Sequence, residues 1–103
     1  MATPEKRVQT PTLKYLTKLK DEGFPIFFER RQAMATSKMG LPDIYVLFKG
    51  KHIEIECKKP IGGELRTMQE KQRDILISAG AIWICPTSVQ EVKDLFEELI
   101  IQD

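Results

Sequence analysis

Apolar residues recur at helical spacing near the start of the chain: Leu13, Leu16 and Leu19. This spacing places them on one helix face and predicts a first helix. Gly23 follows where a C-terminal cap belongs, so we expect the helix to end near residue 22. Thr3-Pro4 and Thr10-Pro11 both resemble an N-cap followed by a first-turn proline. The pattern therefore allows two starts: one helix from about residue 4 with a kink at the second proline, or a later start at that proline.

The middle of the chain predicts three strands. Ile26-Phe27-Phe28 is a short apolar run, and Arg30 to Gly40 lacks periodicity, which indicates a loop. Asp43 to Phe48 and Lys51 to Lys58 are two β-rich runs separated only by Lys49-Gly50. Two such runs joined by two residues predict a β-hairpin.

A helix and a strand are predicted next. Pro60, Gly62 and Gly63 interrupt the pattern. The helix that follows is ended by Gly80 and is marked by Leu65, Met68, Gln72, Ile75, Leu76 and Ala79. Ala81 to Cys85 has the composition of a buried strand and stops at a proline. Trp83 lies in this run, where a core position is favoured over a platform for stacking bases.

Ser88 and Glu91 form a capping-box pair that starts the last helix. Its apolar stripe consists of Val89, Val92, Leu95, Phe96 and Leu99. Core packing is the default role of such a stripe, with a subunit interface as the alternative. The order α-β-β-β-α-β-α predicts an α/β fold with a mixed sheet flanked by helices. A length of 103 residues predicts a single domain over 1–103.

Composition narrows the class of protein further. The chain is 42% hydrophobic and 30% charged, as in ordinary globular proteins. No apolar run approaches the roughly 20 residues that cross a bilayer, and the start lacks the pattern of an export signal, so we expect a cytoplasmic protein without membrane association. Cys57 and Cys85 each lie in an apolar run, which favours buried reduced thiols over a disulfide.

Charge is distributed unevenly along the chain. The formal net charge is +1, with +5 in residues 1–60 and −4 in residues 61–103. This asymmetry fits a nucleic-acid face opposite an acidic back, although dispersed surface charge would produce it too. Arg30, Arg31 and Lys38 lie in or beside the loop before Asp43, where they would contact phosphates or remain flexible surface charge.

The hairpin brings two acids together. With Lys49-Gly50 as a two-residue turn, the pairs Ile44 with Ile55 and Val46 with Ile53 form an apolar side, and Asp43 lies opposite Glu56. Directly opposed residues have Cβ atoms about 4.5–5.5 Å apart, close enough for both carboxylates to hold one divalent ion. Without one they would repel, so a cation is present, or Lys58 neutralises them, or the register is shifted.

Lys58 follows Glu56 by two residues and so lies on the same strand face. In a phosphodiesterase an ammonium group there would stabilise charge that builds on the phosphate. The alternative is that Asp43 caps a turn after Pro42, while Glu54 and its neighbours form an ordinary solvated strand face. The single histidine, His52, argues against histidine-based nuclease chemistry and is expected to be a surface strand residue.

Two motifs bear a resemblance to a known family. Gly40-Leu41-Pro42-Asp43, twelve further residues and then Glu56-Cys57-Lys58 resemble the signature of PD-(D/E)XK nucleases. The chain more closely resembles the virus-type replication-repair nuclease (VRR-NUC) domain, given Leu65 to Gln69 and Gly80 before the next strand. This resemblance implies a restriction-endonuclease-like αβββαβ core.

The resemblance also implies roles for individual residues. Asp43 and Glu56 would be metal ligands, with the backbone carbonyl of Cys57 as a further one. It implies that Lys58 is the catalytic lysine, that Gln69 organises the site and that Glu5 is an auxiliary acid on the first helix.

For activity, the resemblance implies a Mg²⁺- or Mn²⁺-dependent endonuclease that hydrolyses DNA phosphodiesters. Its resemblance to small stand-alone members of this family implies a homodimer that acts on branched DNA, such as four-way (Holliday) junctions. It also implies a role in DNA repair, in a bacterial cell or a phage-infected host. Two alternatives come from other classes of function: a non-cleaving nucleic-acid-binding module of the same fold, and a partner protein whose last helix is the interface.

Overall fold

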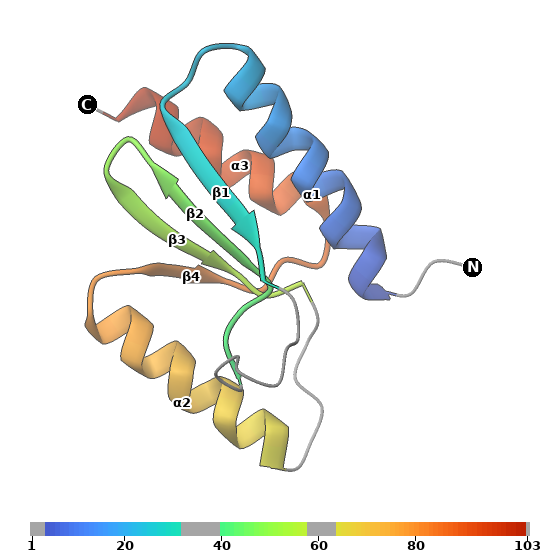
Figure 1. Ribbon diagram of the computed structural model, residues 1–103, viewed down its shortest axis with the longest axis vertical. Coiled ribbons are helices and arrows are strands. Elements are labelled where there is room, and N and C mark those ends of the chain that lie inside the picture. Colours follow the sequence, from blue (N-terminus) through green and yellow to red (C-terminus); the bar gives the residue numbers. More distant parts are fainter. Residues whose placement is uncertain (1–3, 32–39, 58–63, 103) are drawn as a thin grey trace.

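The computed structural model describes residues 4–31, 40–57 and 64–102, and describes side chains over 7–31, 40–57 and 67–102. These described residues form one four-stranded sheet and three helices (Figure 1). In chain order these are α1 (Pro4–Asp21), β1 (Ile26–Arg30), β2 (Ile44–Phe48), β3 (Lys51–Ile55), α2 (Glu64–Ser78), β4 (Ile82–Ile84) and α3 (Val89–Ile101). The sheet order is β1-β2-β3-β4, with β4 parallel to β3 and the other pairs antiparallel. The predicted α/β order and mixed sheet are confirmed.

Helix α1 runs without interruption through Pro11, which decides between the two predicted starts. Proline inside a helix costs about 3 kcal/mol because it removes one hydrogen bond and crowds the preceding turn. Burial of the apolar face of α1 offsets that cost, and this face consists of Val8, Leu16 and Leu19. The helix ends as predicted: Gly23 has a φ of +93°, and the amide of Phe24 donates to the carbonyl of Leu19 at 3.1 Å.

The hairpin turn between β2 and β3 has the geometry that its two residues predict. Lys49 and Gly50 have φ angles of 50° and 78°, as a type I′ turn requires. Ile44 pairs with Ile55, so the predicted register is confirmed. The ammonium of Lys49 donates to the carbonyl of Gln102 at 2.9 Å and so binds the end of α3.

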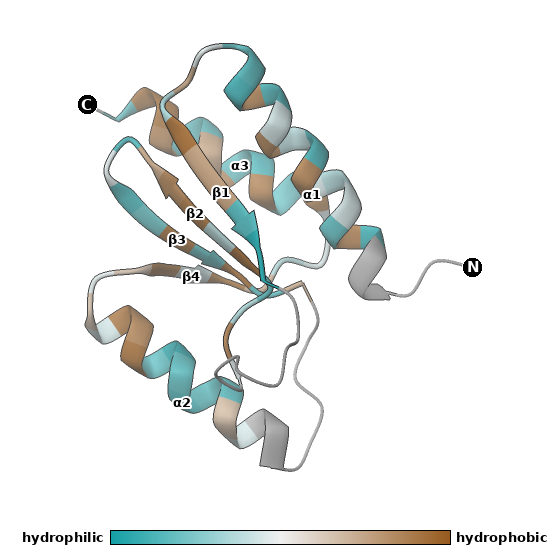
Figure 2. Cartoon of the chain, viewed as in Figure 1, coloured by the Kyte–Doolittle hydropathy of each residue, from teal (hydrophilic) through white to brown (hydrophobic). Residues whose placement is uncertain are grey.

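The hydrophobic core lies between one face of the sheet and helices α1 and α3 (Figure 1). Alternate strand residues are fully buried there: Ile44, Val46, Phe48, Ile53 and Ile55. The last helix contributes Val92, Phe96 and Leu99, so its apolar stripe packs into the core. The rings of Phe48 and Phe96 pack edge to face, with their centres 5.1 Å apart. Figure 2 shows hydrophobic and hydrophilic segments following one another along α1, and β1 changing from hydrophobic at its start to hydrophilic at its end.

Helix α2 lies on the other side of the sheet, next to β4 (Figure 1). The guanidinium of Arg73 lies 5.7 Å from the ring centre of Trp83, which is half-buried. Phe27 and Leu47 pair across β1 and β2 and remain 57% and 40% exposed, so α2 leaves that part of the face open. Both cysteines are free thiols, Cys57 fully buried and Cys85 partly so. Among the described helices none has the length and apolarity to cross a membrane.

Candidate active site

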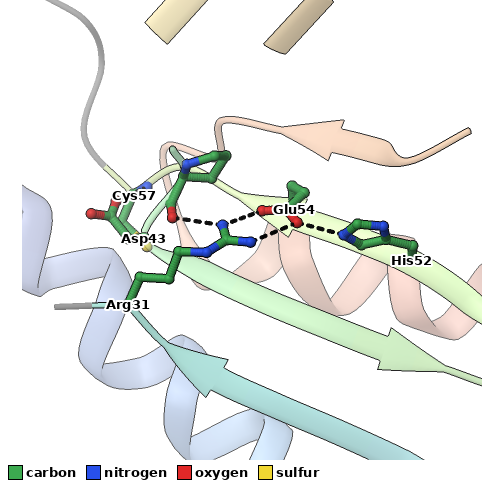
Figure 3. Close-up of polar contacts among 6 residues, drawn as sticks. Arg31, Asp43, His52, Glu54 and Cys57 are labelled. Atoms are coloured by element: carbon green, nitrogen blue, oxygen red, sulfur yellow. Dashed lines mark hydrogen bonds and ion pairs between the residues drawn. The ribbon is translucent and has the colours of Figure 1, made fainter. Parts of the chain in front are cut away.

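Asp43 and Glu56 flank the open end of the β2–β3 hairpin. Asp43 immediately precedes β2 and Glu56 immediately follows β3, so the observed register brings the two residues onto facing chain segments. The amide of Cys57 donates to Oδ2 of Asp43 at 2.7 Å, which joins the two segments directly (Figure 3). The amide of Glu56 donates to the carbonyl of Ile84 at 2.9 Å and holds this end of β3 against β4.

Burial distinguishes Glu54 and Glu56 from the side chains of an ordinary solvated strand face. Glu54 is 0% exposed and Glu56 is 3% exposed. A buried carboxylate is costly unless hydrogen bonds or opposite charges compensate for the lost water. Asp43 is partly exposed, and its carboxylate bonds a residue fourteen positions away, so it does more than cap its own turn. The solvated-face alternative therefore does not describe either glutamate.

Gly40 connects the Pro42-Asp43 segment to helix α2. Its φ is +84°, and a Cβ at this position would lie 2.7 Å from the backbone carbonyl atoms of Met68. It would also lie 2.9 Å from the backbone nitrogen of Gln69. Only glycine permits both the backbone angle and this close approach. The contact brings the backbone of Gln69, whose side chain is half-buried, close to Gly40, and Gly40 precedes Asp43 by three residues.

A buried ion-pair cluster lies beside Asp43, and sequence reasoning did not predict it. The guanidinium of Arg31 binds both carboxylate oxygens of Glu54, with Nη2 at 3.0 Å from Oε2, and Nη1 also donates to the carbonyl of Pro42 at 3.0 Å (Figure 3). His52 Nε2 lies 2.5 Å from Oε2 of Glu54.

The ring of Tyr45 packs against two members of this cluster. The centre of the Tyr45 ring lies 4.7 Å from the centre of the His52 ring and 5.6 Å from the central carbon of the Arg31 guanidinium. His52, expected at the surface, is therefore a half-buried member of a polar network. The signal available in the sequence was its position two residues before Glu54 on one strand face, but nothing local indicated Arg31.

The remaining predicted site residues are distributed as follows. Glu5 belongs to the first turns of α1, and its side chain lies outside the described residues, as do Lys58 and Lys38. Arg30 is exposed and lines a shallow groove of about 530 Å³ against α1, together with Gln9, Thr10, Leu13, Lys14 and Thr17. The predicted phosphate contacts of Arg30, Arg31 and Lys38 stay predictions.

The donor atoms at the hairpin end suit a hard divalent cation. Carboxylate and carbonyl oxygens are the ligands that Mg²⁺ and Mn²⁺ prefer, and Asp43, Glu56 and the carbonyl of Cys57 would supply them. Over the described part of the chain, no three histidine, cysteine or acidic side chains gather closely enough to hold an ion by themselves. Two carboxylates with a backbone carbonyl fit an ion that completes its coordination with water and substrate phosphate.

Comparisons with known proteins bear on the fold. No family model matches the sequence, and no curated protein gives a significant match. A solved structure described as a VRR_NUC domain matches with a TM-score of 0.66, covering 93% of this chain and 97% of that one at 21% identity. At this identity the likeness shows the fold. The chain has the fold of a VRR_NUC domain, as its motifs predicted.

Proposed function

We propose that this chain is a metal-dependent nuclease that hydrolyses DNA phosphodiester bonds at the open end of the β2–β3 hairpin. The observation that carries the proposal is the joining of Asp43 to the segment of Glu56 and Cys57 by a 2.7 Å hydrogen bond. The fold shared with a VRR_NUC domain supports it. Asp43, Glu56 and the backbone carbonyl of Cys57 would hold Mg²⁺ or Mn²⁺.

The bound ion would supply Lewis-acid polarisation of the phosphate and a more acidic water. The protein's own residues supply the rest. The Cys57 amide fixes the Asp43 carboxylate, and burial of Glu56 limits its motion. Lys58, two residues after Glu56, would stabilise negative charge developing on the phosphate. Gln69 would orient groups at the site from α2, and Glu5 would add an acid from α1.

The substrate we propose is branched DNA, such as a four-way junction, bound by a homodimer in the cytoplasm of a bacterial cell or a phage-infected host. One 103-residue chain has little surface with which to recognise a junction, whereas a two-fold dimer would present paired sites to two strands. Arg30 and Lys38 would contact phosphates beside the cut. The excess of positive charge in residues 1–60 supports a polyanionic partner.

Cleavage of a labelled four-way junction and a matched linear duplex tests the proposal. The wild type is compared with Lys58→Ala and Asp43→Asn in Mg²⁺, Mn²⁺ and EDTA, and sedimentation gives the oligomeric state. We expect cutting that needs the metal, that either substitution abolishes and that is faster on the junction. Binding of DNA without cutting in either metal would replace the nuclease by a non-cleaving module of the same fold.

A further inference from the structure

The side chain of Arg31 connects two segments that are distant in sequence. Its guanidinium binds the carboxylate of Glu54, 23 residues away on β3, and through Nη1 also binds the carbonyl of Pro42 at 3.0 Å. The peptide after that carbonyl leads into Asp43. A planar guanidinium can make these bonds at once because its donors point in several fixed directions.

The backbone of Arg31 holds the same segment. Its amide donates to the carbonyl of Asp43 at 2.7 Å, one step beyond the last β1–β2 pair. Asp43 is therefore held from β1 through its main chain and from Cys57 through its carboxylate. Any shift of the Pro42-Asp43 peptide would move the carboxylate relative to Glu56.

The environment of Glu54 makes this connection rigid. Glu54 is 0% exposed, while the Arg31 side chain is 28% exposed. His52 binds Oε2 of the same carboxylate at 2.5 Å, and the Tyr45 ring lies against both Arg31 and His52. A carboxylate with both oxygens bonded away from water has one favourable orientation, so the guanidinium that it binds is fixed as well.

We propose that Arg31 and Glu54 are positioning residues, which hold the Pro42-Asp43 peptide so that the Asp43 carboxylate faces Glu56. This inference rests on the proposed function, because it assigns these residues to the same site. It also gives Arg31 a role different from a phosphate contact, since Nη1 and Nη2 are both bonded to protein atoms.

Three variants test the proposal. Arg31→Lys keeps the positive charge next to Glu54 but cannot bind the carboxylate and the Pro42 carbonyl together. Glu54→Gln keeps the size of the side chain but replaces one acceptor oxygen by a donor. The double variant Arg31→Gln/Glu54→Gln removes both charges of the pair, so neither is left unpaired. Arg73→Lys is the matched control, because Arg73 is 37% exposed and pairs with Asp74 and the Trp83 ring.

The measurements distinguish an effect on the position of the Asp43 carboxylate from an effect on DNA binding. Calorimetry with Mn²⁺ gives metal affinity, NMR-detected hydrogen exchange of the Cys57 amide reports its bond to Asp43, and fluorescence anisotropy in EDTA gives DNA affinity. Single-turnover cleavage gives the rate of the bound complex. Thermal unfolding identifies variants that do not fold, and the double variant keeps the test decisive if Glu54→Gln unfolds.

We expect Arg31→Lys and Glu54→Gln each to weaken Mn²⁺ binding and slow cleavage by about tenfold to a hundredfold, as loss of outer-shell partners commonly does. The Cys57 amide should exchange faster in both, the double variant should lose no more than either single one, and DNA affinity should stay at the wild-type value. Arg73→Lys should change none of these quantities.

Two results would overturn the proposal. In the first, Arg31→Lys weakens DNA binding while Glu54→Gln leaves metal affinity and cleavage unchanged, which would make Arg31 a phosphate contact. In the second, exchange of the Cys57 amide is unaffected in every folded variant. If the wild type neither binds Mn²⁺ nor cuts DNA, the proposed function fails, and Cys57 exchange still decides whether Arg31 and Glu54 position Asp43.

Discussion

The amide of Cys57 donates a 2.7 Å hydrogen bond to the carboxylate of Asp43, fourteen residues earlier in the chain. This bond crosses the open end of the hairpin and occupies one carboxylate oxygen. An ionised carboxylate has further acceptor sites, so Asp43 can accept this bond and still bind a cation. The relationship thus leaves a structural and a chemical role for the same side chain, and the two can be separated by substitution.

Asp43→Asn should retain the fold and lose activity. The amide oxygen of asparagine can still accept the Cys57 bond, whereas the negative charge that attracts a divalent ion is gone. We expect cleavage to fall by at least about 10²-fold, the loss typical when one stabilising polar group of an active site is removed. The thermal midpoint should stay close to that of the wild type. A variant that cuts normally in Mg²⁺ would remove Asp43 from the proposed site.

Gly40→Ala should destabilise the protein more than Gly23→Ala does. Both glycines have positive φ, but only the Cβ at Gly40 would meet backbone, 2.7 Å from atoms of Met68. Backbone strain is common to the two variants, so their difference isolates the contact with α2. Overpacking of this kind costs about 1–3 kcal/mol. Urea unfolding measures the free energies, and equal losses in the two variants would contradict the close approach.

Lys49→Ala should lower the free energy of unfolding by about 0.5–1 kcal/mol, the usual contribution of a cation at a helix C-terminus. The Lys49 ammonium donates to the carbonyl of Gln102 at 2.9 Å, and that helix end has no basic residue in its last turn. Lys51→Ala is the control, because Lys51 belongs to the same hairpin. Salt should reduce the effect of the first variant, and an identical loss in both would show that the hairpin charge is responsible instead.

Stability should decrease at alkaline pH through Tyr15. Burial, followed by the charges of Glu97 and Glu22, raises the pKa of Tyr15 above its ordinary value of 10.0. The folded chain therefore keeps the phenol proton to higher pH than the unfolded chain does. The stabilisation is complete below pH 10.0 and is lost as the pH rises through the folded pKa. In Tyr15→Phe this alkaline loss of stability should vanish. Urea unfolding below and above pH 10.0 measures the free energy of unfolding of both proteins.

Much of the fold could be predicted from the sequence because the signals are local. A two-residue turn at Lys49-Gly50 and period-two alternation fix the hairpin register, and that register alone predicted that Asp43 lies opposite Glu56. Glycines placed after apolar helical stretches marked where α1 and α2 end. These features depend on residues a few positions apart, whose geometry the backbone itself restricts.

Other features of the protein were decided only by the tertiary structure, because they depend on which distant segments pack together. Continuity of α1 through Pro11 required the burial of its apolar face, and the burial of Glu54 depended on the residues that cover its strand. The pairing of Arg31 with Glu54 and the approach of Gly40 to Met68 join residues more than twenty positions apart. No local spacing encodes such contacts, because the free energy that forms them comes from packing distant elements against one another, and a charge can lose its water only once those elements enclose it.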